Sequence, residues 1–86
     1  MEQEQEVTKD KHVRITVEVD GKDKHIIFES SRVTGREIRN KAGAPLSDDL
    51  VRLIHGKPSG GNIGLDESAE IHDDDRFLAL PTGTVS

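Results

Sequence analysis

The sequence predicts a small α+β domain in which several strands and one short helix share a single apolar face. Two observations lead to this prediction: a strict alternation of apolar and polar residues in the first strand, and a short helix with recognisable signals at both of its ends. Only 31% of the 86 residues are hydrophobic, so the core must be small. A domain of this kind lies near the lower size limit for independent folding.

The segment VRITVEVD predicts a half-buried strand. Its apolar residues, at positions 13, 15, 17 and 19, lie on one face, and its polar residues lie on the other. Asp20 and Gly21 supply a reversal, and the segment HIIFE predicts a second strand in which Ile26 and Phe28 share a face. The two strands are therefore expected to form a hairpin.

The segment VTGREIRNKAG predicts the helix. Thr34 can cap its first turn, and Glu37, three residues later, completes a capping box. Val33 can pack on Ile38 as a hydrophobic staple. Gly43 is expected to end the helix in a left-handed conformation, so the helix is short.

The second half of the chain predicts a third strand in DDLVRLIHGK, a very short extended piece in IGL and a last strand in RFLAL. The segment PSGGN forms a turn, and DESAEIHDDD is polar and turn-like with Ile71 as its apolar anchor. Pro81 ends the last strand because it cannot donate to a sheet ladder. The predicted core consists of Val13, Ile15, Val17, Ile26, Phe28, Ile38, Leu53, Ile71 and Phe77.

The charge and composition divide the chain into a domain and two ends. Residues 1–12 have three Glu and two Gln in their first six positions, which predicts a disordered leader that cannot bury enough apolar surface to fold. Residues 13–81 form the predicted domain, and residues 82–86 form a predicted flexible tail.

Composition argues against several classes of partner and site. A net charge of −5 with 2% aromatic residues offers neither the basic field nor the stacking rings of a nucleic-acid binder. No apolar run is long enough for a membrane span, and no secretory signal is present. The absence of cysteine removes disulfides and cysteine-based metal sites, and it fits a reducing, cytoplasmic setting.

The order of the elements within about 70 residues is that of the β-grasp fold. The stretch RLIHGKPSGGNIGLDESAEIHDDDRFLALPTG resembles ubiquitin-like proteins from their third strand to their tail, with an Arg-Leu-Ile strand, a Gly-Lys turn, an isolated Leu-Asp, an Ile anchor and a tail glycine. The segments VTGREIRNKAG and FLALPTG also resemble the repeat unit of the bacterial multiubiquitin family. The resemblance covers roughly residues 13 to 83, in a single copy.

This resemblance implies a ubiquitin-like β-grasp domain, with a mixed sheet of four to five strands and one short helix packed across it. It also implies a monomeric protein modifier of a bacterial conjugation pathway, which is itself no enzyme and holds no cofactor. Its implied partners are a ubiquitin-activating-like enzyme, a ubiquitin-conjugating-like enzyme and a JAB-type metallopeptidase. Two alternatives use the same fold: an interaction module that is never conjugated, and a sulfur carrier with a terminal thiocarboxylate.

Gly83 is the expected conjugation and processing residue. An activating enzyme must adenylate a terminal carboxylate and pass it on as a thioester through a narrow channel. That route needs an extended tail without a side chain near the reacting carbon, and glycine provides it. Because Thr84, Val85 and Ser86 follow Gly83 here, a peptidase would have to cut after the glycine first.

Strand alternation predicts an exposed apolar patch on the sheet. If Val51 and Leu53 face the core, alternation places their neighbours on the outer face, which are Leu50, Arg52 and Ile54. If Phe77 and Ala79 face the core, Leu78 and Leu80 face outward as well. The predicted partner-binding patch then consists of Ile54, Leu78, Leu80 and Arg52. Ubiquitin-like proteins present such a cluster to partners. The inverted register would bury the charge of Arg52 and expose Phe77, so it is disfavoured.

Other polar residues carry weaker signals. Lys57 follows the His-Gly turn and corresponds to a chain-linkage lysine of ubiquitin, although a lysine beside a turn commonly serves only solubility. His72 and the three aspartates after it match neither a zinc site nor an EF-hand loop, so no metal is expected. The remaining histidines are scattered, and no hydrolytic triad or phosphate loop is present, so no catalytic residue is predicted.

Overall fold

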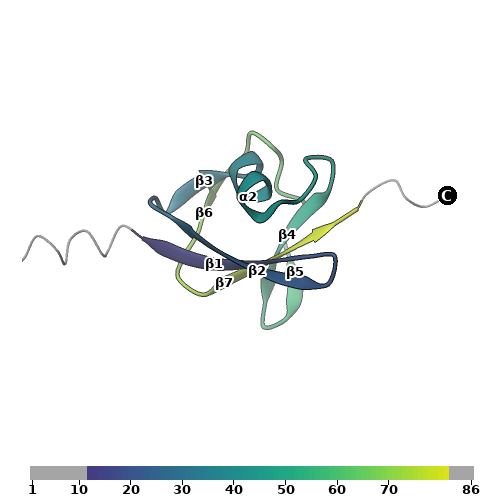
Figure 1. Cartoon of the computed structure of the whole chain (residues 1–86), viewed down its shortest axis with the longest axis horizontal. Helices are drawn as coiled ribbons and strands as arrows, with labels where there is room; N and C mark the ends of the chain where they lie inside the picture. The colour runs from purple at the N-terminus through teal and green to yellow at the C-terminus, as the bar shows by residue number, and fades with distance from the viewer. Residues whose placement is uncertain (1–11, 82–86) are drawn as a thin grey trace, which may run out of the picture.

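The computed structural model describes residues 12–81, which form a five-stranded mixed sheet, a two-stranded sheet and one short helix (Figure 1). The large sheet has the order β2-β1-β7-β4-β5, and its central strands β1 and β7 are parallel. Its strands are β1 (Val13–Val19), β2 (Lys22–Phe28), β4 (Asp49–Ile54), β5 (Lys57–Ser59) and β7 (Asp75–Leu80). The helix α2 (Gly35–Ala42) packs across one face. The protein therefore has the predicted α+β fold of the β-grasp type.

The short strands are the part of the architecture that the sequence pattern did not predict. β3 (Arg32–Thr34) pairs with β6 (Ser68–Glu70), and β5 follows a turn formed by His55 and Gly56. Each of these strands has three residues, which is too short to show an alternating pattern. The predicted extended piece IGL forms no strand. The predicted leader, apart from His12, and the predicted tail lie outside the described residues.

The helix begins and ends where its sequence signals place it. Thr34 Oγ1 accepts a hydrogen bond from Glu37 N at 3.2 Å, and Glu37 Oε1 accepts one from Thr34 N at 2.8 Å, which completes the capping box. Gly43 ends the helix with φ of 78° in the left-handed region. The helix spans eight residues, and within residues 12–81 no helix is long and apolar enough to cross a membrane.

The core lies between the inner face of the large sheet and α2. Seven of the predicted core residues are buried: Val13, Ile15, Val17, Phe28, Ile38, Ile71 and Phe77. Ile26 is half-buried and packs against this cluster. The prediction for Leu53 is wrong, because its side chain is half-buried and lies outside the core, whereas Leu50 is 0% exposed.

The first turn of α2 docks on the segment that follows β5. Gly35 N donates to Glu67 O at 3.1 Å, and Arg36 N donates to Leu65 O at 2.9 Å. These bonds satisfy N–H groups that have no partner within a helix. The close approach is possible because Gly35 has no side chain: a Cβ there would meet the carbonyl oxygen of Gly64 at a distance that real Cβ atoms do not show.

Gly35→Ala is expected to destabilise the protein, although the same change in an ordinary helix interior is favourable. The added methyl group must displace the Gly64 backbone, and overpacking of this kind costs about 1 to 3 kcal/mol. Urea unfolding followed by circular dichroism measures the change. Gly61→Ala is the matched control, because nothing lies within 4 Å of the position that its Cβ would occupy. Equal stability of the two variants would show that Gly35 does not pack closely against the Gly64 backbone.

Arg39 is a helix residue whose side chain is only 1% exposed. Its Nε donates to Asp48 O at 3.0 Å, and its Nη2 donates to Asn62 Oδ1 at 3.1 Å and to Ile63 O at 2.8 Å. Burial lowers the pKa of this guanidinium from its ordinary value, while the charges of Asp49 and Asp48 act in the opposite direction. Arg39 thus links α2 to the segment before β4 and to the segment after β5.

Arg39→Ala is expected to lower the free energy of unfolding by about 3 to 5 kcal/mol, because it leaves the buried carbonyls of Asp48 and Ile63 without their charged donor and removes one bond from the part-buried Asn62. Arg36→Ala serves as the control. Arg36 forms its 3.0 Å ion pair with Asp66 at the surface, so its loss should cost less than about 1 kcal/mol. Denaturant melts of both variants measure the difference, and a small effect for Arg39→Ala would contradict its structural role.

Candidate functional site

The predicted orientation of the strand at residues 49–54 is wrong. In β4, Leu50 lies opposite Ala79, and Arg52 lies opposite Phe77. Because cross-strand partners share a face, and because Phe77 and Ala79 are buried, Leu50 and Arg52 belong to the helix side of the sheet. Val51, which was predicted to face the core, lies on the outer face.

The inward position of Arg52 has a physical explanation. Its Nη1 forms an ion pair with Asp75 Oδ2 at 2.8 Å, and its Nη2 donates to Glu70 O at 2.6 Å. The guanidinium carbon also lies 5.0 Å from the centre of the Phe77 ring. The sequence argument assumed that turning this charge inward would leave it unpaired. The structure supplies a carboxylate, a carbonyl and an aromatic face, so that cost is offset.

The outer face of the sheet nevertheless carries an apolar patch, with a changed membership. Val51 lies opposite Leu78, and Leu53 lies opposite Pro58. Leu80, two residues after Leu78 on the same face, is 43% exposed. We call this surface the β4–β7 patch, and it consists of Val51, Leu53, Pro58, Leu78 and Leu80.

The structure places only two of the predicted patch residues, Leu78 and Leu80, on this surface. Ile54 is 46% exposed, but it alternates with Leu53 and therefore lies on the helix side at the end of β4. Arg52 lies on that side as well. Val51 and Leu53 belong to the β4–β7 patch because of the register between β4 and β7. The sequence alone did not give this register.

Charged side chains surround the β4–β7 patch. Glu18 lies opposite Leu78 on β1, and Asp49 lies opposite Leu80 on β4. Arg76, opposite Leu53, pairs with Asp23 at 3.3 Å. An apolar centre with a polar rim is the usual arrangement of a protein-binding surface.

The end of β7 and the predicted linkage lysine Lys57 lie at defined positions relative to the β4–β7 patch. Leu80 ends β7 and is followed directly by Pro81, the last described residue. Gly83, the predicted conjugation residue, lies outside the described residues. Lys57 is exposed at the start of β5, after a tight turn in which His55 and Gly56 have φ of 54° and 78°. Its role in chain linkage stays a prediction.

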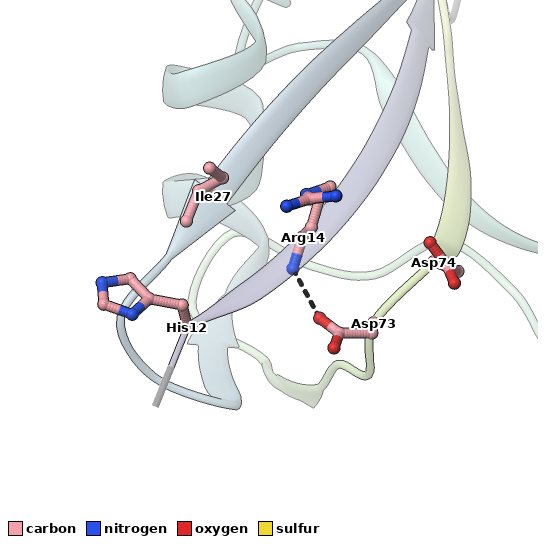
Figure 2. Close-up of a pocket in the computed structure, with 5 residues that line it drawn as sticks. All are labelled: His12, Arg14, Ile27, Asp73 and Asp74. Carbon is pink, nitrogen blue, oxygen red and sulfur yellow. Dashed lines mark hydrogen bonds between the residues drawn. The ribbon is translucent and has the colours of Figure 1, made fainter. Parts of the chain in front are cut away.

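A second surface feature is an open hollow of about 420 Å³ at the start of β1. Figure 2 shows its lining residues, His12, Arg14, Ile27, Asp73 and Asp74, which come from β1 and the residue before it, from the end of β2 and from the turn before β7. Arg14 N donates to Asp73 Oδ1 at 2.9 Å, and Asp74 N donates to Arg14 O at 2.7 Å. All five residues are exposed, so the hollow is part of the open surface.

Asp75, the first residue of β7, accepts hydrogen bonds from the turn before the strand and from β4. His72 N donates to Asp75 Oδ2 at 2.9 Å, and the His72 ring lies 3.6 Å from the same oxygen. Asp75 also pairs with Arg52. Among residues 12–81 no group of three acidic, histidine or cysteine side chains is arranged to hold a metal ion.

The fold and the β4–β7 patch define a small α+β protein of the β-grasp type with an apolar surface on the open face of its sheet. No family model matches the chain, and neither a curated protein nor a solved structure matches it at a significant level.

Leu50→Ala and Ile54→Ala distinguish the observed orientation of β4 from the predicted one. Leu50 is fully buried, so its truncation should cost about 2 to 5 kcal/mol of unfolding free energy. Ile54 is 46% exposed and lies outside the core, so its truncation should cost less than about 1 kcal/mol. Chemical denaturation of both variants measures the two values, and a reversed order would support the register predicted from alternation.

Proposed function

We propose that this chain is a ubiquitin-like protein modifier of a bacterial conjugation pathway. Its domain binds the pathway enzymes through the β4–β7 patch, and the carboxylate of Gly83 is attached to a target after residues 84–86 have been removed. The chain is then a substrate of enzymes and not itself an enzyme. An activating-like enzyme, a conjugating-like enzyme and a JAB-type metallopeptidase, acting in the cytoplasm, are the proposed partners.

The observation that carries this proposal is the continuity between the patch and the tail. β7 contributes Leu78 and Leu80 to the β4–β7 patch, and it leads directly through Pro81 towards Gly83. A partner that covers the patch therefore holds the domain by the strand from which the tail departs. Binding at this surface would fix the start of the tail and so reduce the conformational freedom lost when Gly83 enters an active site.

Gly83 suits the proposed activation chemistry because glycine has no side chain beside its carboxylate. An activating enzyme joins the carboxylate to adenylate, displacing pyrophosphate from ATP, and a cysteine thiol then displaces the adenylate to form a thioester. Both steps need access to a carbonyl carbon that is not shielded by a side chain. Pro81 follows the last residue of β7 and has no backbone N–H to donate to a sheet ladder.

A second candidate function is a protein-interaction module that is never conjugated. The half-buried side chains of Val51, Leu53 and Leu78 favour it, because this apolar surface requires no chemistry at the tail to be useful. A sulfur carrier uses the same activation of a terminal carboxylate and is not separately favoured by any feature of the described residues.

Adenylation and thioester formation by the cognate activating enzyme test the proposal. Residues 1–86 should be inactive, and residues 1–83 should be active. Residues 1–83 with Gly83→Val should be folded but blocked, because the hydrophobic core of the described domain is built from residues 13–79. Pyrophosphate exchange and gel detection of the thioester provide the readouts.

A surface variant separates the two candidate functions. In residues 1–83, Leu78→Ser should weaken activation, whereas Ile54→Ala should not, because only Leu78 belongs to the β4–β7 patch. Equal activity of residues 1–86, 1–83 and the Gly83→Val form would falsify attachment through Gly83. Partner binding that is lost in Leu78→Ser but insensitive to the tail would instead establish the interaction module.

A further inference from the structure

β2 forms a long open edge of the large sheet. The strand has seven residues, and among residues 12–81 the only strand that pairs with it is β1. The opposite edge of the sheet is the three-residue strand β5, which is interrupted by Pro58. A row of unpaired backbone groups on an edge strand can accept another extended chain.

The register identifies the backbone groups that point away from β1. Asp20 and Gly21 form a two-residue turn with φ of 55° and 78°, and Val19 lies opposite Lys22. A turn of this type closes on a hydrogen-bonded pair, after which bonded and non-bonded pairs alternate along the hairpin. The N–H and C=O groups of Asp23, His25 and Ile27 therefore point to the open edge. Lys41 Nζ donates to Ile27 O at 3.3 Å from outside the strand, which supports this assignment.

The two sides of this edge differ in chemistry. Lys22 and Lys24 lie opposite Val19 and Val17, so they are on the helix side of the sheet. Lys41 joins them there from α2, with its Nζ 5.4 Å from the centre of the Phe28 ring. The other side of the edge carries Ile27, which is 49% exposed and lines the hollow shown in Figure 2. The helix side of the edge thus presents three cations, and the other side presents Ile27 together with His25 and with Asp23, whose carboxylate is paired with Arg76 at 3.3 Å.

We propose that the β2 edge binds an extended partner segment in which acidic and apolar residues alternate. The segment adds a sixth strand by hydrogen bonding to the backbone of Asp23 and His25 and to the N–H of Ile27, whose carbonyl already accepts from Lys41 Nζ. Because side chains alternate along a strand, its acidic residues face the lysines of the helix side while its apolar residues pack on Ile27. This surface is separated from the β4–β7 patch by β1.

Charge disfavours a second copy of this chain as the occupant. Antiparallel pairing of two β2 edges with full overlap is centred on His25 and sets Lys22 of one copy opposite Phe28 of the other. Lys41 lies over that Phe28 ring, so two ammonium groups would meet. Like charges in neighbouring positions oppose pairing, whereas an acidic segment would satisfy the same lysines.

Titration of the full chain with a synthetic eight-residue peptide that alternates glutamate and valine tests the proposal. Amide chemical shifts should change along Lys22–Phe28, and the dissociation constant should rise with salt concentration. A peptide that alternates lysine and valine should bind at least about tenfold more weakly, because the local charges then repel. Equal binding of the two peptides, or no binding of either, would overturn the proposal.

Two pairs of variants locate the site. His25→Pro removes an outward N–H without breaking a backbone hydrogen bond to β1, and it should weaken binding about tenfold relative to His25→Ala, which loses the same side-chain contact with Thr16. The double variant Lys22→Gln, Lys24→Gln should weaken binding, while Arg32→Gln, Arg36→Gln, which removes two exposed cations elsewhere, should not. The lysine pair decides the matter if His25→Pro fails to fold. Self-association of the free chain that His25→Pro abolishes would show that a second copy is the occupant, against the proposal.

Discussion

The guanidinium of Arg39 determines where β4 begins and therefore which of its side chains reach the outer face. Arg39 Nη2 donates to Asn62 Oδ1, and the same oxygen accepts a hydrogen bond from Leu50 N at 2.8 Å. Ile63 N donates in turn to Leu50 O at 2.8 Å. Both backbone groups of Leu50 are thus held by a segment that the helix arginine fixes. With Leu50 held in the core, the alternation of the strand follows.

The β4–β7 patch is a consequence of that constraint. Once Leu50 faces the helix, Val51 and Leu53 must face the opposite side, where β7 presents Leu78 and Leu80. A slip of one residue would exchange the two faces completely. The buried hydrogen bonds of Arg39 therefore select which side chains of β4 form the outer face, although Arg39 itself does not lie on that face.

Local chemistry made the helix and the hairpin predictable from the sequence. The cap at Thr34, the left-handed Gly43 and the alternation that begins at Val13 each act over a few residues, and the structure confirms all three. Which side chains of β4 face the core could not be predicted from such local signals. LVRLI is apolar at positions on both faces, and the cost of turning Arg52 inward depends on Asp75 and Glu70, which are distant in sequence. Gly83 lies beyond the described residues, so its role is still a prediction.

The parallel pairing of β1 and β7 has a mechanical consequence. Because the two strands run in the same direction, the start of β1 and the end of β7 lie at opposite ends of the sheet (Figure 1). A pull applied between those two points acts along both strands and slides one past the other. The register from Ile15 opposite Asp75 to Val19 opposite Ala79 would then be loaded all at once, instead of opening one pair at a time. A domain joined to other molecules through these two ends would resist stretching more strongly than one whose end strands form a hairpin.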